Sequence, residues 1–234
     1  PTALNHGQKM LREMLAPAIL RSNTLLSLQV WQAAKGDISL IDDPLRTSVL
    51  RVKLASEKDV VKAKLIQRDY MLQYAATDNY RVRDSILKAI GFGAASGNKQ
   101  YALDWALKFE QEDFWTVCTW VMKSGGAVEA WNFYKNLPNT NELSWPPQKV
   151  SDTSKAKFKY FLWGFEEMAN TTLSAEWYNF FTCHGRSDCK YSAYQSTIKD
   201  VYTSMNMLAY HDSKFIKSVL FTNTFYWYQA CSEH

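Results

Sequence analysis

The sequence lacks any apolar run near the roughly 20 residues that a membrane-spanning helix needs. Its N-terminus also lacks the basic region and apolar core of a signal sequence. The sequence also has little excess charge of either sign, since it contains 27 Lys and Arg and 23 Asp and Glu. These charged residues are scattered rather than gathered into runs. We therefore expect a soluble chain without a membrane span, for which nucleic acid is only a weakly supported partner.

Catalytic and cofactor motifs are also missing. None of the four histidines lies four residues from another, as a zinc pair on one helix requires. The glycine pairs near Gly91 and Gly125 lack the preceding strand of a phosphate-binding loop. Cys118 lies between apolar residues, which is typical of a buried thiol rather than a nucleophile. We expect no catalytic residue, no cofactor, no metal site and no enzymatic activity of the isolated chain.

Two features concern the environment of the protein. Cys183 and Cys189 flank a polar, turn-like segment in which a small disulfide loop closes easily. Asn170-Thr171-Thr172 is a sequon for N-glycosylation. Both indicate an extracellular or secretory location, although reduced thiols and a chance sequon stay open as the alternative.

The residues that are present favour helices. Hydrophobic residues make up 47% of the chain, with nine Trp, 13 Tyr and 12 Phe, enough to fill a core without a metal. Apolar residues recur at helical spacing between capping residues, and alternation typical of strands is scarce. Asp43-Pro44 opens one helix, and Asp78 and Ser174 are expected to cap two others. We predict an all-α fold of stacked antiparallel helix pairs, an α-solenoid of HEAT-like type.

One stretch interrupts this pattern. Residues 136–154 contain three prolines and several polar residues. The segment is either a surface loop or a subdomain boundary, and the return of the same helical pattern afterwards favours the loop. We therefore expect residues 1–234 to form a single all-α domain.

Candidate binding residues fall into two groups. Arg81, Arg83 and Lys88, close to Tyr80, are positioned to line a groove for an anion such as a peptide carboxylate or an RNA phosphate. An exposed helix face without a ligand explains the same residues. The second group is aromatic and suits contacts between subunits; it comprises Trp145, Tyr226, Trp227 and Tyr228.

From about Ile41 to Leu220 the order of motifs resembles the C-terminal helical domain of the aminopeptidase N and puromycin-sensitive aminopeptidase family of zinc peptidases. Asp43 to Arg46 is similar to that domain's Asp-Leu-Arg helix start, and residues 82–91 are similar to its helix ending in Ala-Leu-Gly. Glu112-Asp113 falls where the family has Gln-Asp, without the Arg that commonly precedes it. Residues 130–136 resemble its Ala-Trp-x-Phe-x-Lys segment, and Glu176 to Phe181 resemble a later helix.

These are packing motifs, and the family's zinc-binding His-Glu-x-x-His helix is absent from the sequence. The resemblance implies a stand-alone or excised helical domain, whose family role is to cover the active site and receive the far end of the peptide. We therefore predict a non-catalytic domain that binds a peptide or protein. The alternative is a subunit of a self-assembling viral-type capsid or nucleoprotein. Such a subunit would form a homo-oligomer, and as a nucleoprotein it would coat RNA.

Overall fold

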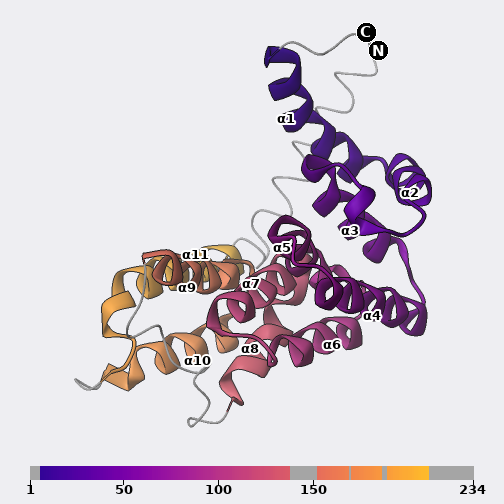
Figure 1. Cartoon of the computed structure of the whole chain (residues 1–234). Coiled ribbons are helices and arrows are strands. Elements are labelled where there is room, and N and C mark those ends of the chain that lie inside the picture. Colours follow the sequence, from indigo (N-terminus) through magenta and orange to yellow (C-terminus); the bar gives the residue numbers. More distant parts are fainter. Residues whose placement is uncertain (1–5, 138–151, 169, 186–188, 211–234) are drawn as a thin grey trace, which may run out of the picture. The chain divides into compact units, whose positions relative to one another are not determined.

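The computed structural model describes residues 6–137, 152–168, 170–185 and 189–210, and within these ranges it contains helices and turns but no strand. The prediction of an all-α fold is confirmed. The chain divides into two compact units, Pro1–Ser144 and Trp145–His234. This division falls inside the segment 136–154, for which the sequence left a loop or a boundary open. Figure 1 shows the helices of each unit.

The first unit contains eight helices within its described residues, joined by short connections. In chain order they are α1 (His6–Ser22), α2 (Thr24–Ala33), α3 (Asp43–Ser56), α4 (Val60–Ala76), α5 (Tyr80–Ala89), α6 (Ser96–Ala106), α7 (Gln111–Val121) and α8 (Ala127–Lys135). Two 3₁₀ turns, η1 (Ile38–Leu40) and η2 (Ile90–Phe92), and a π turn, η3 (Met122–Gly126), lie between them.

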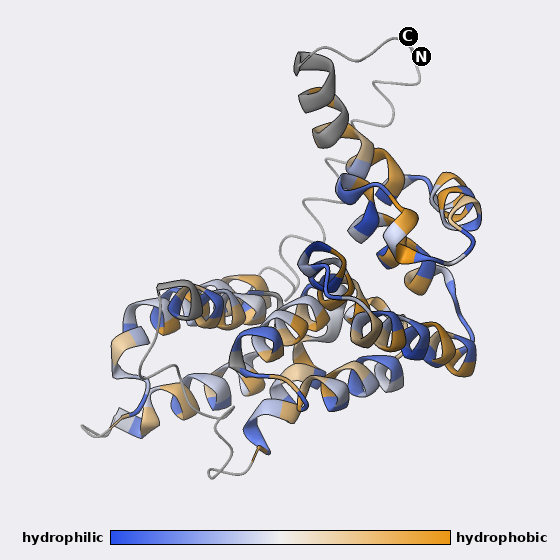
Figure 2. Ribbon diagram, in the orientation of Figure 1, coloured by the Kyte–Doolittle hydropathy of each residue, from blue (hydrophilic) through white to orange (hydrophobic). Residues whose placement is uncertain are grey.

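These helices pack with partners two positions away along the chain. Helix α3 contacts α1 and α5, and α5 contacts α7, while α4 contacts α6, and α6 contacts α8. Hydrophobic and hydrophilic residues occur together on the described parts of these helices, as Figure 2 shows by colour. The apolar sides meet in a core that includes Leu50, Ile86, Leu103, Trp115 and Trp131, all fully buried. Burial of these faces is the main source of helix stability in this unit.

A pair of buried amides joins three segments of this core. The Gln67 Nε2 atom of α4 donates to the carbonyl oxygens of Ile90 and Asn98, each at 2.8 Å. Asn98 Nδ2 donates to Gln67 Oε1 and to the Val60 carbonyl, each at 3.2 Å. Gln67 and Asn98 are both buried, so their polar atoms depend on these partners.

The second unit is built around aromatic side chains. It contains α9 (Asp152–Trp163), α10 (Thr171–Phe181) and α11 (Gln195–Tyr210), with 3₁₀ turns η5 (Gly164–Glu167), η6 (Cys183–Gly185) and η7 (Ser192–Tyr194). Edge-on and tilted ring contacts link Phe161 to Phe165, Phe165 to Trp177, and Trp177 to Phe181. Cys183 and Cys189 form a disulfide beside this core, with Cα atoms 5.4 Å apart.

The structure corrects two predicted helix caps. Helix α5 is capped by Asn79 rather than Asp78, because Asn79 Oδ1 accepts the Arg81 N–H at 3.0 Å. Helix α10 begins earlier than predicted and is capped by Asn170. Ser174 is instead buried inside α10, where its hydroxyl donates to the Thr171 carbonyl at 3.0 Å. Several polar residues near each start can cap, and tertiary packing selects among them.

The glycine in η2 permits a close approach between this turn and α7. A Cβ added at Gly91 would lie 2.8 Å from the Cα and N atoms of Val121, which are backbone atoms and cannot turn aside. Gly97, near the start of α6, offers a contrast, since a Cβ there meets nothing closer than a Val60 methyl at 4.0 Å.

We therefore expect Gly91→Ala to lower the free energy of unfolding by about 1–3 kcal/mol through overpacking. The matched variant Gly97→Ala should leave stability unchanged or raise it by up to about 1 kcal/mol, because it restricts the unfolded chain. Urea unfolding followed by circular dichroism measures both. Equal stabilities of the two variants would contradict the close packing of η2 against α7.

Candidate functional site, a polar pocket between α3 and α5

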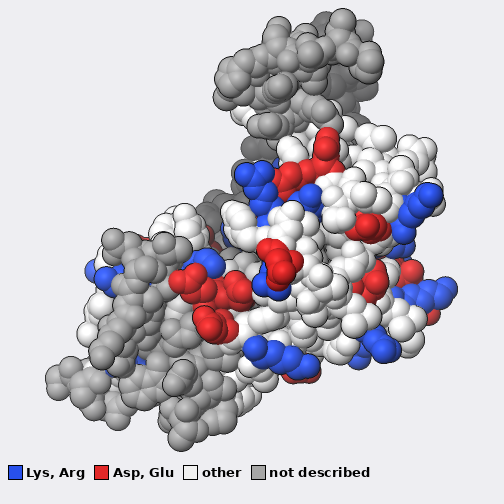
Figure 3. Space-filling model, in the orientation of Figure 1, with Lys and Arg blue, Asp and Glu red and all other residues white. Residues whose placement is uncertain are grey.

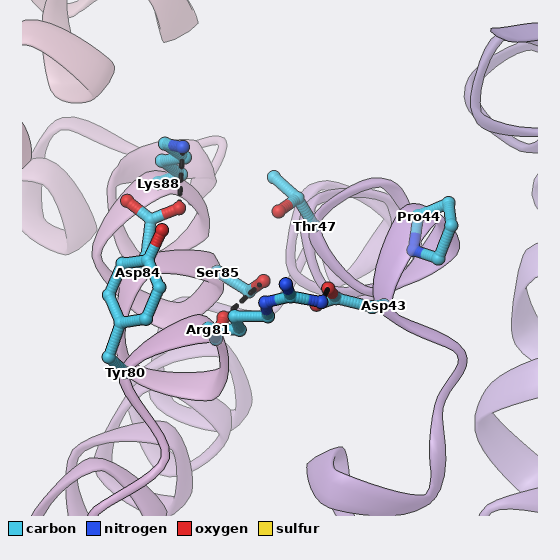
Figure 4. Close-up of a pocket in the computed structure, with 8 residues that line it drawn as sticks. All are labelled: Asp43, Pro44, Thr47, Tyr80, Arg81, Asp84, Ser85 and Lys88. Carbon is cyan, nitrogen blue, oxygen red and sulfur yellow. Dashed lines mark hydrogen bonds and ion pairs between the residues drawn. The ribbon is translucent and has the colours of Figure 1, made fainter. Parts of the chain in front are cut away.

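A pocket of about 670 Å³ lies in the first unit, between α3 and α5. Figure 4 shows its lining, which comprises Asp43, Pro44 and Thr47 of α3 and Tyr80, Arg81, Asp84, Ser85 and Lys88 of α5. The residues of each helix recur at intervals of three or four, so they lie along the sides that face one another. The volume is in the range of small-ligand pockets, about 300–1,000 Å³.

Three ion pairs set the charge of the lining. Asp43 lies between two arginines, with Oδ1 2.7 Å from Arg46 Nη1 and Oδ2 2.9 Å from Arg81 Nη1. On α5, Lys88 Nζ is 2.5 Å from Asp84 Oδ2, one helical turn away. The lining therefore presents cations and carboxylates together.

The two arginines around Asp43 differ in how firmly they are held. Arg46 is 5% exposed, and it also donates to the carbonyl oxygens of Ile38 and Ile41, at 3.0 and 2.9 Å. It therefore fixes the start of α3. The Arg81 side chain is 68% exposed, so its pair with Asp43 contributes at most about 1 kcal/mol in water. A ligand can replace that pair at little cost.

Arg51, one turn beyond Thr47 on α3, is a functional candidate that the sequence reasoning missed. Its guanidinium carbon lies 3.8 Å from the centre of the Trp120 ring and 4.6 Å from that of Phe92. Its Nε donates to the Lys88 carbonyl at 3.1 Å, which places it beside the pocket. The neighbouring Leu50 and Val52 made it look like one polar interruption of an apolar stripe.

Among the described residues, Arg51 has no ion-pair partner. No carboxylate in the described ranges lies within ion-pair distance of its guanidinium, and Nη1 and Nη2 find no acceptor there. Burial, followed by repulsion from Arg21, lowers the pKa of Arg51 to about 10, while Asp84 acts in the opposite direction. Even so, the guanidinium stays charged near neutral pH, so an anion placed beside it would be favoured.

The other predicted site residues are placed as follows. Arg81 and Lys88 line the pocket, but Arg83 does not; its guanidinium lies 5.3 Å from the Tyr74 ring centre and 3.5 Å from Asp78 Oδ1. Asn170 caps α10 in the second unit, where the Cys183–Cys189 disulfide also lies. The aromatic candidates Trp145, Tyr226, Trp227 and Tyr228 lie outside the described residues.

The described residues offer neither an activated cysteine nor a cluster of metal ligands. Cys118 is buried in α7, and burial raises the pKa of its thiol, which keeps it protonated. Among the residues with described positions, His, Cys, Asp and Glu form no group of three that could hold a metal ion. Figure 3 shows Lys and Arg beside Asp and Glu on the face it presents, without a broad patch of either sign.

No family model, curated protein or solved structure matches this chain. Among the described helices, none combines the length and the apolar character needed to traverse a bilayer. The assignment of function therefore depends on the pocket and on the physical chemistry of its lining.

Proposed function

We propose that this chain is a non-catalytic α-helical repeat domain that binds a peptide or protein partner, as the active-site-covering domain of zinc aminopeptidases does. The observation that carries this proposal is the guanidinium of Arg51, which lies beside a polar pocket without a carboxylate partner among the described residues. The stepwise packing of α3, α5 and α7, and of α4, α6 and α8, supports the helical-repeat part.

The charges of the pocket favour an acidic segment of polypeptide as the ligand. Arg51 is stacked on Trp120 and Phe92, so its terminal nitrogens are oriented before a carboxylate arrives. Asp43 and Asp84 in the lining accept hydrogen bonds from backbone or side-chain donors of the same ligand. A long polyanion would meet these carboxylates repeatedly, which disfavours RNA as the ligand.

We expect a short acetylated oligoglutamate to bind the intact chain saturably at or below millimolar concentration, and the matching oligoglutamine to bind more weakly. Arg51→Gln should weaken oligoglutamate binding roughly 10- to 100-fold, because a hydrogen bond to a charged group contributes about 1.5–3 kcal/mol. Isothermal titration calorimetry at low and high salt measures this effect, and salt should reduce the affinity.

The matched control is Arg83→Gln, which removes the same charge from α5 at a side chain that lies against Tyr74 and pairs with Asp78, away from the Lys88 carbonyl that Arg51 contacts. This variant should keep the affinity of the intact chain. If oligoglutamate shows no saturable binding at millimolar concentration, the peptide-binding proposal fails. If both variants lose affinity equally, net charge rather than the Arg51 site explains the binding.

Exposed apolar side chains on α1 and α2 favour the second candidate function, a self-assembling structural subunit. Met14 is 71% and Leu25 69% exposed, and Leu11, Leu15 and Ile19 are exposed on the same helix as Met14. Figure 2 shows α2 coloured as hydrophobic over much of its visible surface. Clusters of exposed apolar residues mark interaction surfaces more often than isolated ones do.

Native mass by light scattering after size exclusion distinguishes the two functions. A peptide-binding domain should remain a monomer near 27.0 kDa over a wide range of concentration. A mass that grows with concentration, and returns to the monomer in a Met14→Glu, Leu25→Glu double variant, would favour assembly through α1 and α2. Removal of residues 223–234 tests the aromatic C-terminal segment separately.

A further inference from the structure

The N-cap of α10 coincides with the sequon of the chain. Asn170 has extended backbone angles, φ −133° and ψ 111°, and its Oδ1 accepts the N–H groups of Thr172 and Leu173 at 3.1 and 3.0 Å. Two N–H donors identify this atom as the amide oxygen. The amide nitrogen, Nδ2, donates to no atom within the described ranges, so the capping role occupies only one end of the side chain.

The surroundings of Asn170 leave that nitrogen accessible. Asn170, Thr171 and Thr172 are all exposed, whereas Ser174, one turn later, is buried and contacts Asn206 of α11. The first turn of α10 thus directs its sequon residues to solvent and its packing residues to the core. A large group attached to Nδ2 would displace neither the cap nor a core contact.

The disulfide of the same unit indicates the oxidising environment in which N-glycosylation takes place. The disulfide between Cys183 and Cys189 requires an oxidising compartment to persist. N-glycosylation takes place in the secretory pathway, which is also oxidising. Asn170 heads the only Asn-x-Ser/Thr sequence in the chain, so a single site is concerned.

We propose that Asn170 carries an N-linked glycan. In the transfer, a bond forms between Asn170 Nδ2 and the anomeric carbon of the first sugar, and the bond from that carbon to a polyprenyl pyrophosphate donor breaks. Nδ2 loses one proton, and the lipid pyrophosphate leaves with the bonding electrons. Oδ1 takes no part in the new bond and continues to cap α10.

Three substitutions separate glycosylation from capping when the intact chain is secreted from eukaryotic cells. Asn170→Asp keeps a capping oxygen but removes the amide acceptor, and Thr172→Ala keeps the whole cap but breaks the sequon. Thr172→Ser preserves both. We expect the unchanged chain and Thr172→Ser to lose mass on treatment with peptide N-glycosidase, and the other two variants to show no loss. Circular dichroism should give all four the same helix content.

The protein from its native source supplies the decisive measurement. Peptide mapping without reduction should find a glycan on Asn170 and a linkage between Cys183 and Cys189. An unmodified Asn170 in the secreted chain would show that the site is not an acceptor. An unmodified Asn170 or free thiols at both cysteines in the native protein would overturn the proposal, whatever the secreted chain shows.

Discussion

The buried amides of Gln67 and Asn98 connect α4, the end of α5 and α6, and the packing of the first unit depends on these connections. Gln67 is fully buried and bonds to the end of α5 through Ile90, and to α6 through Asn98. Asn98 in turn bonds back to Val60 at the start of α4. Each unsatisfied buried polar group would cost about 1–3 kcal/mol, so the three segments must meet in one register or lose these bonds. Apolar packing alone tolerates sliding and repacking, whereas this hydrogen-bond geometry does not.

That register also positions the pocket. Ile90 belongs to η2, which ends α5, and Gly91 next to it lies against the backbone of Val121 in α7. The C-terminal end of α5 is therefore fixed on two sides, which sets where the Lys88 carbonyl meets Arg51 of α3. At the other end, buried Arg46 fixes the start of α3 and holds Asp43 for Arg81. The pocket walls are consequently helices rather than loops, which fixes where the lining side chains begin.

Helical periodicity made the fold class predictable, because the apolar stripes of the chain are long and lie between clear breaks. The exact helix starts were harder to predict. Asp78 and Asn79 are equally good caps in sequence, and so are Ser174 and Asn170, and only packing decides between them. Arg81 and Lys88 could be identified from charge and spacing, but Arg51 could not. Its role depends on Phe92 and Trp120, which are distant in sequence and meet only in the folded chain. Its one sequence signal was a charge within a largely buried helix face.

The chemistry of Arg51 suits the proposed binding of an anionic ligand. A partly buried guanidinium packed against two aromatic rings loses hydration and does not become an acid or base near neutral pH, because its pKa remains about 10. Such a group can hold an anion but cannot exchange a proton with it. The neighbouring carboxylates, Asp43 and Asp84, are paired with Arg46, Arg81 and Lys88. A pocket lined by such ion pairs recognises a ligand through complementary charge, and a ligand with an acidic group at Arg51 and donors toward these carboxylates matches it.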